Sequence, residues 1–187
     1  TTAESHNRIM LVEVMGRTKG WIATYAGIAG GADAILIPEV PYDLNEVADV
    51  IRSRHRHGHS YSVVVVAEGI EPPPSVPQQD AEIDAFGFKR LGGVAYQVAP
   101  VLEELTGFET RVTVLGHLQR GGTPTAFDRV LGTRLGVAAA DLAVAGTHGV
   151  MVAIRGANIE PVPLDEACAD IRGVDEATYD VAQTFFG

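Results

Sequence analysis

Residues 111–129 read RVTVLGHLQRGGTPTAFDR, and this stretch predicts a strand that passes through a glycine turn into a helix. Up to Leu118, apolar residues alternate with polar or small ones, which is typical of a strand. A Gly-Gly pair then interrupts the pattern. Thr123 is suited to be the N-cap of a helix and Pro124 its first residue, and we expect this helix to continue to about Ala145.

This junction has features of an anion-binding site. The first backbone N–H groups of a helix have no partner within it, and the helix dipole favours negative charge there. Arg111, His117 and Arg120 lie at the start, the end and the exit of the predicted strand, so they could serve the same anion. The alternative is an ordinary glycine turn with solvated cations, since such junctions are common in α/β folds. The stretch by itself leaves both interpretations open.

The composition excludes several classes of protein. The 187 residues are 46% hydrophobic and 20% charged, as in an ordinary globular domain. The formal net charge of −10 argues against nucleic acid or an anionic membrane as a partner. Cys168 is the only cysteine, so we expect no disulfides and a cytoplasmic location. No signal peptide is recognisable, and no apolar run approaches the roughly 20 residues that span a membrane.

The order of the other expected elements indicates the fold class. Short apolar runs at residues 8–14, 34–37 and 61–67 predict strands, each followed by a helix or a loop and a helix. This alternation is typical of a three-layer α/β protein, with a mostly parallel sheet and helices on both faces. Further strands are expected at residues 150–154 and 159–162, followed by two short helices.

Three other segments carry specific expectations. Residues 19–29 predict a helix with Lys19 in its first turn, where a cation opposes the dipole unless an anion joins it. Four prolines between residues 70 and 90 exclude a helix and predict a long loop. The helix that ends near Gly107 contains Pro100, which we expect to kink or split it.

Two strand ends carry residues suited to a ligand. Met15, Gly16 and Arg17 follow the first strand, and Glu68 follows the third. Open α/β sheets bind ligands at the carboxyl ends of their strands, although a glutamate that simply reaches solvent is equally compatible with the pattern. The tract HRHGH at residues 55–59 does not predict a metal site, because no cysteine or carboxylate accompanies its histidines.

Three segments resemble the signatures of one family, the 6-phosphofructokinases. They are VEVMGR at residues 12–17, LGHLQRGG at residues 115–122 and TPTAFDR at residues 123–129. The resemblance extends over the whole chain and corresponds to the C-terminal half of a family member, a Rossmann-like half. It implies phosphoryl transfer from ATP or pyrophosphate to the 1-hydroxyl of fructose 6-phosphate, giving fructose 1,6-bisphosphate in glycolysis.

The resemblance also implies a role for each matching residue. Met15, Gly16 and Glu68 would hold the sugar ring and its hydroxyl groups. His117 and Arg120 would bind the 6-phosphate. These residue types agree with the chemistry, since phosphoryl transfer depends on positioning and on charge neutralisation.

Three more arginines receive roles in the same way. Arg17 would be the catalytic residue of this chain, stabilising charge on the phosphoryl group during transfer, and would also contact the substrate. Arg8 and Arg111 would reach the 6-phosphate in a neighbouring subunit of a homodimer or homotetramer. The site would then be shared across a subunit interface.

Some parts of the family pattern are missing. The general base, an aspartate in a T-I-D-N-D-type motif, and the Gly-Gly-Asp donor loop do not occur in these residues. Asp128 is no substitute, because it lies in the first turn of the predicted helix as a partner of the dipole. The chain alone is therefore expected to bind sugar phosphate without turnover, with Mg²⁺ and the donor held by the N-terminal half of the same polypeptide. Its start at Thr1 fits a fragment.

The resemblance leaves the donor and the regulation open. The residues that would decide between ATP and pyrophosphate belong to the N-terminal half. Effector-regulated bacterial members carry a lysine-rich loop that corresponds to residues 57–61, which contain no lysine here. This difference argues against activation by ADP and inhibition by phosphoenolpyruvate.

The resemblance implies a domain organisation with three segments. Residues 1–118 would form the fructose 6-phosphate-binding domain, residues 119–157 would pack with the N-terminal donor-binding domain, and residues 158–187 would return to the first domain. A non-catalytic, regulatory half of a larger phosphofructokinase is the competing interpretation, since it would keep the same sugar-binding residues. An α/β domain with an unrelated phosphate ligand would leave the joint occurrence of the motifs unexplained.

Overall fold

The computed structural model describes residues 7–73, 76 and 92–186. The chain divides into two compact units, one of residues 1–120 and 173–187 and one of residues 121–172. Most of the predicted proline-rich loop lies outside the described residues, so that expectation stays a prediction.

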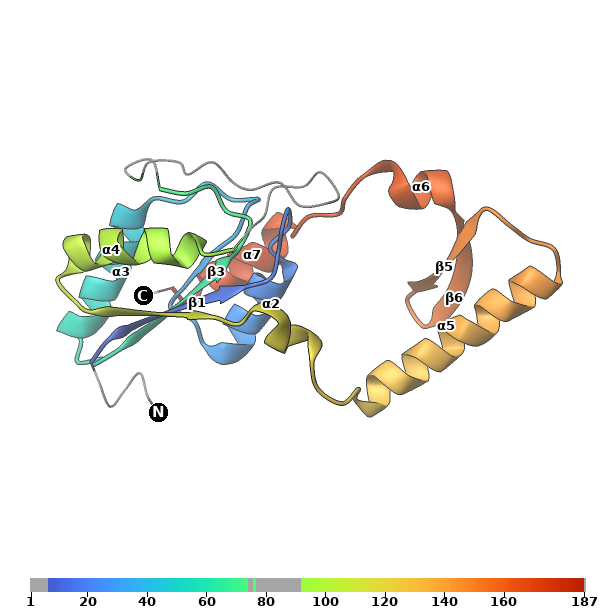
Figure 1. The fold of residues 1–187 in the computed structure, drawn as a ribbon, viewed down its shortest axis with the longest axis horizontal. Coiled ribbons are helices and arrows are strands. Elements are labelled where there is room, and N and C mark those ends of the chain that lie inside the picture. Colours follow the sequence, from blue (N-terminus) through green and yellow to red (C-terminus); the bar gives the residue numbers. More distant parts are fainter. Residues whose placement is uncertain (1–6, 74–75, 77–91, 187) are drawn as a thin grey trace. The chain divides into compact units, whose positions relative to one another are not determined.

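The first unit is built on a four-stranded sheet in the order β2-β3-β1-β4. Strand β1 (Ile9–Val14) pairs with β3 (Ser62–Ala67) on one side and with β4 (Thr110–Val114) on the other, and β2 (Ala34–Leu36) pairs with β3. All these pairs are parallel, so the carboxyl ends of the four strands lie at one edge of the sheet (Figure 1). The predicted parallel sheet is confirmed.

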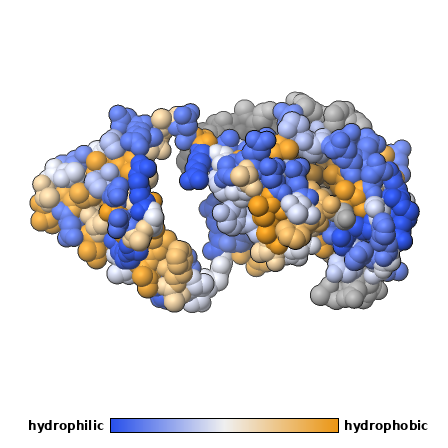
Figure 2. Space-filling view, turned by 180° about the vertical axis from the view of Figure 1, so that it is seen from behind, coloured by the Kyte–Doolittle hydropathy of each residue, from blue (hydrophilic) through white to orange (hydrophobic). Residues whose placement is uncertain are grey.

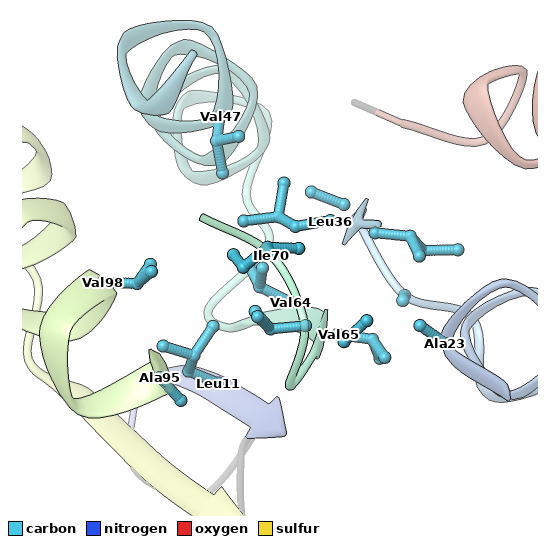
Figure 3. Close-up of a cluster of buried hydrophobic side chains, with 14 of the residues drawn as sticks. Leu11, Ala23, Leu36, Val47, Val64, Val65, Ile70, Ala95 and Val98 are labelled. Atoms are coloured by element: carbon cyan, nitrogen blue, oxygen red, sulfur yellow. The ribbon is translucent and has the colours of Figure 1, made fainter. Parts of the chain in front are cut away.

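Helices cover both faces of this sheet, as predicted (Figure 1). Helices α3 (Leu44–Arg56) and α4 (Val94–Thr106) contact each other on one face, and α2 (Trp21–Gly30) contacts α7 (Glu176–Gln183) on the other. Figure 3 shows Val47 of α3 and Val98 of α4 pointing into the core from one side of the sheet. On the other side, Ala23 of α2 lies near Val65 of β3 (Figure 3).

The ends of the helices follow local sequence signals. The carboxylate of Asp43 accepts a hydrogen bond from the backbone N–H of Asn45 at 2.8 Å and caps α3. Helix α2 ends at Gly31, whose φ of 66° is left-handed and favours glycine. It begins at Trp21, so Lys19 lies before the first turn and not within it. Helix α4 continues through Pro100, which is exposed, so the helix is not split there.

One buried carboxylate closes the N-terminus of α4. Glu13 of β1 is 1% exposed, and its two side-chain oxygens accept hydrogen bonds from the backbone N–H groups of Gly93 (2.7 Å) and Ala95 (2.9 Å). These N–H groups have no partner within the helix, and the dipole favours a negative charge beside them. The N-cap residue, Gly93, has no side chain for this purpose. Glu13 therefore joins β1 to α4 with a charged hydrogen-bonded contact.

The second unit contains a long helix, a hairpin and a short helix. Strands β5 and β6 pair only with each other, in antiparallel orientation, and form a separate sheet. The chain therefore returns to the first unit at Gly173, later than the expected residue 158, because β6 belongs with β5. The elements of this unit are α5 (Ala126–Val144), β5 (Val150–Arg155), β6 (Asn158–Pro163) and α6 (Leu164–Ala169).

The apolar side chains of the second unit are mostly exposed. Val162 is the one buried hydrophobic residue among residues 121–172, all of which are described. Phe127, Val137 and Val144 of α5 are 72%, 56% and 91% exposed. Figure 2 shows hydrophobic residues at the surface of this unit. Exposed apolar side chains gathered on one helix are typical of interaction surfaces.

We expect the replacement Glu13→Gln to lower the free energy of unfolding by about 1–3 kcal/mol, because one amide oxygen would face two N–H groups that both need an acceptor. Urea unfolding of the full-length protein that contains this chain, followed by circular dichroism, measures the change. Glu104→Gln, on the exposed side of α4, is the matched control and should stay within about 0.5 kcal/mol of the parent. Equal stability of the two variants would contradict the role of Glu13.

Candidate functional site

The carboxyl ends of β1, β3 and β4 bring most of the predicted site residues to one edge of the sheet. After β4 the chain forms a short 3₁₀ helix, η1 (Gly116–Arg120), where the sequence predicted that the strand would continue to Leu118. Six of the eight predicted site residues follow these three strands: Met15, Gly16 and Arg17 after β1, Glu68 after β3, and His117 and Arg120 in η1.

The loop after β1 is held from two sides. The backbone N–H of Met15 donates to the side-chain oxygen Oε1 of Gln119 at 3.1 Å. The backbone N–H of Gly16 donates to Oε1 of Glu68 at 3.3 Å, and the N–H of Gly69 donates to the carbonyl oxygen of Gly16 at 3.0 Å. The loop is therefore tied both to the end of β3 and to η1.

Gln119 is a residue to which sequence reasoning assigned no role. Its Nε2 donates to the carbonyl oxygen of Gly116 at 3.1 Å while its Oε1 holds the N–H of Met15. One side chain thus fixes the shape of η1 and its position against the loop after β1. The sequence signal that could have indicated a role for Gln119 is its position between two predicted site residues, His117 and Arg120.

The cations of η1 face solvent. His117 and Arg120 are both exposed, and neither forms an ion pair within the described part of the chain. Arg17, in the loop after β1, is exposed as well. His117 and Arg120 suit the binding of an anion, because no carboxylate among the described residues pairs with them.

Arg8 and Arg111 lie at the opposite end of the sheet. Arg8 precedes β1, and Arg111 is the second residue of β4. Arg111 lies three residues before the end of β4, so roughly 10 Å of strand separate it from the carboxyl edge of the sheet, and His117 follows that edge in η1. Arg111 and His117 therefore lie toward opposite edges of the sheet, which disfavours one anion shared by Arg111, His117 and Arg120 of the same chain.

The helix that was expected to begin at Thr123-Pro124 begins later in the chain, at Ala126. Helix α5 is capped by Thr125, not Thr123, because Thr125 and Asp128 form a capping box. Hydrogen bonds from the hydroxyl and the backbone N–H of Thr125 to Oδ2 of Asp128, at 2.7 and 2.9 Å, hold the pKa of this carboxyl below its usual value. Asp128 thus lies in the first turn of α5, as predicted, and η1 and residues 121–125 come between β4 and this helix in the chain. The predicted strand–glycine–helix junction does not form.

The histidine tract makes structural contacts. His55 stacks on Phe108 with ring centroids 3.9 Å apart, and its Nδ1 lies 2.9 Å from the carbonyl oxygen of Ile51. Nδ1 of His57 lies 2.8 Å from the carbonyl oxygen of Ser53. Within residues 7–73, 76 and 92–186, no three His, Cys, Asp or Glu side chains are grouped so that they could hold a metal ion.

A pocket of about 380 Å³ opens between the loops after β2 and β3, lined by residues 37–42 and 70–72. Its charged lining residues are Glu39 and Glu71, so it is unsuited to an anion. Burial, together with the charge of Glu71, raises the pKa of the Tyr42 hydroxyl to about 12. The cationic edge after β1 and β4 is therefore the better candidate for an anionic ligand.

The chain is similar to known proteins in both sequence and fold. The family model described as phosphofructokinase matches residues 1–143. The chain belongs to the phosphofructokinase family. It is 52% identical, over 188 aligned positions, to the ATP-dependent 6-phosphofructokinase of Mycobacterium tuberculosis, an alignment that covers 100% of this chain and 55% of that protein. The chain thus spans about half the length of this curated relative.

Solved structures of family members have the same fold. The phosphofructokinase of Saccharomyces cerevisiae matches with a TM-score of 0.72 and 34% identity, over 98% of this chain and 22% of that chain. A pyrophosphate-dependent phosphofructokinase from Nitrosospira multiformis matches with a TM-score of 0.73 and 25% identity, over 94% of this chain and 44% of that chain. The family contains both ATP- and pyrophosphate-dependent members, so membership does not identify the donor.

We expect Gly69→Ala to disrupt the loop after β1. An added Cβ at Gly69 would lie 2.0 Å from the carbonyl oxygen of Arg17 and 2.5 Å from that of Gly16, both backbone atoms. Overpacking of this kind should lower the free energy of unfolding by about 1–3 kcal/mol. Gly30→Ala is the control: nothing lies within 4 Å of its added Cβ, and the change should stabilise by about 0.4–1 kcal/mol. Thermal unfolding distinguishes the two, and a harmless Gly69→Ala would show that the loop is not tightly held.

Proposed function

We propose that the protein containing this chain is a 6-phosphofructokinase, and that the chain supplies its fructose 6-phosphate site. The whole protein would transfer a phosphoryl group from ATP or pyrophosphate to the 1-hydroxyl of fructose 6-phosphate, in the cytoplasm. The observation that carries the proposal is that the loop after β1 contacts both Glu68 and η1, so that a carboxylate and two cations share one edge of the sheet. Membership of the family supports it.

The chain offers groups suited to both the 6-phosphate and the sugar ring of the substrate. His117 and Arg120 would bind the 6-phosphate, since a guanidinium presents a planar fork of donors that fits phosphate oxygens. Oε1 of Glu68 already accepts a hydrogen bond from Gly16, and its second oxygen would accept one from a sugar hydroxyl. Met15, beside Gly16 in the same loop, would contact the sugar ring. The fixed backbone there would orient the sugar between phosphate and donor.

The chemical step would depend on both halves of the polypeptide. Arg17 would stabilise the charge on the phosphoryl group during transfer, from the end of the loop that holds the sugar. The described residues do not fit a metal ion, so Mg²⁺ would be bound with the donor phosphates outside this chain. The general base would also come from the N-terminal half, and this chain alone would not turn over.

The second unit would pack against the N-terminal half. Its apolar side chains on α5 are exposed, and about half of the curated relative's length is not covered by this chain. Arg8 and Arg111 would act on the 6-phosphate in a neighbouring subunit of a homodimer or homotetramer, since they lie at the edge of the sheet away from their own chain's site.

A phosphotransfer assay on the full-length protein tests the proposal. It would contain fructose 6-phosphate and Mg²⁺, with ATP in one sample and pyrophosphate in another. We expect fructose 1,6-bisphosphate with one of the two donors, and that result would also identify the donor. Binding of fructose 6-phosphate without product from either donor would favour a regulatory half. If fructose 6-phosphate does not bind and no product forms, the proposal is contradicted.

We expect Arg120→Ala and His117→Ala each to weaken fructose 6-phosphate binding by roughly 1.5–3 kcal/mol, the size of a hydrogen bond to a charged group. Isothermal titration of the full-length variants measures the change. Arg56→Ala, which removes an exposed arginine at the end of α3, is the control and should bind like the parent. Unchanged affinity in both site variants would show that the phosphate binds elsewhere.

A further inference from the structure

Glu109 lies between the two arginines at the amino edge of the sheet. Its Oε2 accepts a hydrogen bond from Nε of Arg8 at 2.6 Å, and its Oε1 pairs with a terminal nitrogen of Arg111. The carboxylate therefore uses one oxygen for each guanidinium. The side chains of Glu109 and Arg111 are 47% and 56% exposed, so the group is open to solvent.

The strands explain why these three side chains meet. Met10 is paired in register with Arg111, so Arg8, two residues before Met10, points to the same face of the sheet as Glu109, two residues before Arg111. The backbone also joins the two segments, because the N–H of Ile9 donates a hydrogen bond to the carbonyl oxygen of Glu109 at 3.0 Å. The positions of Arg8 and Glu109 are thus fixed by the pairing of β1 with β4.

The start of β4 is itself anchored to α4. The N–H of Thr110 donates to Oε1 of Glu103 at 2.6 Å, and the helix end that carries Glu103 is followed directly by Gly107 and β4. Glu109 is therefore not on a loose loop. It extends from a strand start that has backbone contacts to β1 and a side-chain contact to α4.

We propose that Glu109 is a positioning residue, which holds Arg8 and Arg111 as one preformed anion-binding pair. This inference rests on the proposed function, in which both arginines reach the 6-phosphate in a neighbouring subunit. Two guanidinium groups on neighbouring strands repel each other, and a bridging carboxylate offsets that repulsion. The contact with Glu109 uses only Nε of Arg8 and one terminal nitrogen of Arg111, so the other N–H groups of both forks can face the phosphate.

Preorganisation of this kind should appear in substrate affinity and not in the chemical step. In the full-length enzyme we expect Glu109→Gln to raise the fructose 6-phosphate concentration at half-saturation roughly three- to tenfold, the range of coupling between neighbouring charged groups, with little change in kcat. Thermal unfolding should be unaffected, because exposed ion pairs contribute little to stability. Glu104→Gln removes the same charge from the exposed side of α4 and should leave the half-saturation unchanged.

A second background separates positioning from a structural role. If Glu109 acts through the two arginines, Glu109→Gln should add almost nothing to the double variant Arg8→Ala/Arg111→Ala. If Glu109→Gln weakens fructose 6-phosphate binding as much in the double variant as in the parent, the inference is overturned. It is also overturned if Glu109→Gln in the parent leaves the fructose 6-phosphate concentration at half-saturation unchanged or lowers it.

The single arginine variants also separate the positioning role of Glu109 from the proposed site shared between subunits. Raised half-saturation in Arg8→Ala and Arg111→Ala, with no effect of Glu109→Gln, would overturn only the role of Glu109. No effect of either arginine replacement would overturn the shared site, and with it the positioning role that depends on it.

Discussion

The parallel pairing of β1 on both of its sides is the constraint on which the site depends. Because β3 and β4 run in the same direction as β1, the loops that follow all three strands meet at one edge of the sheet. The same pairing places Arg8 beside Glu109 at the other edge. A shift of one residue in either register would turn alternate side chains to the opposite face and would separate the groups at both edges.

Carboxylates inside the first unit serve mainly as acceptors for backbone N–H groups. Glu13 holds the start of α4, and Glu39 accepts hydrogen bonds from the N–H of Gly20, just before α2, at 3.0 Å. Oε1 of Glu39 also accepts from Val174 at 3.0 Å, where the chain has returned to the first unit. The chain has a formal net charge of −10, yet the carboxylates engaged in this way do not neutralise His117 or Arg120.

The sequence predicted the parallel sheet, its flanking helices and the residues at the strand ends, because apolar runs and glycine signals are local. It did not predict the 3₁₀ helix after β4 or the capping of α5 by Thr125, because Thr123-Pro124 and Thr125 are both acceptable helix starts and only the reciprocal contact with Asp128 decides between them. The sequence also did not predict the roles of Gln119 and Glu109. Each depends on which strands are neighbours, and that is settled by contacts between residues about a hundred positions apart.

The most direct test of the central claim is a structure of the full-length protein with fructose 6-phosphate bound. The account predicts the 6-phosphate within hydrogen-bonding distance, about 2.7–3.2 Å, of His117 and Arg120 of one subunit and of Arg8 and Arg111 of its neighbour. The sugar should lie against Met15, Gly16 and Glu68. A phosphate bound in the pocket after β2, or one that no arginine of a second subunit reaches, would contradict the account.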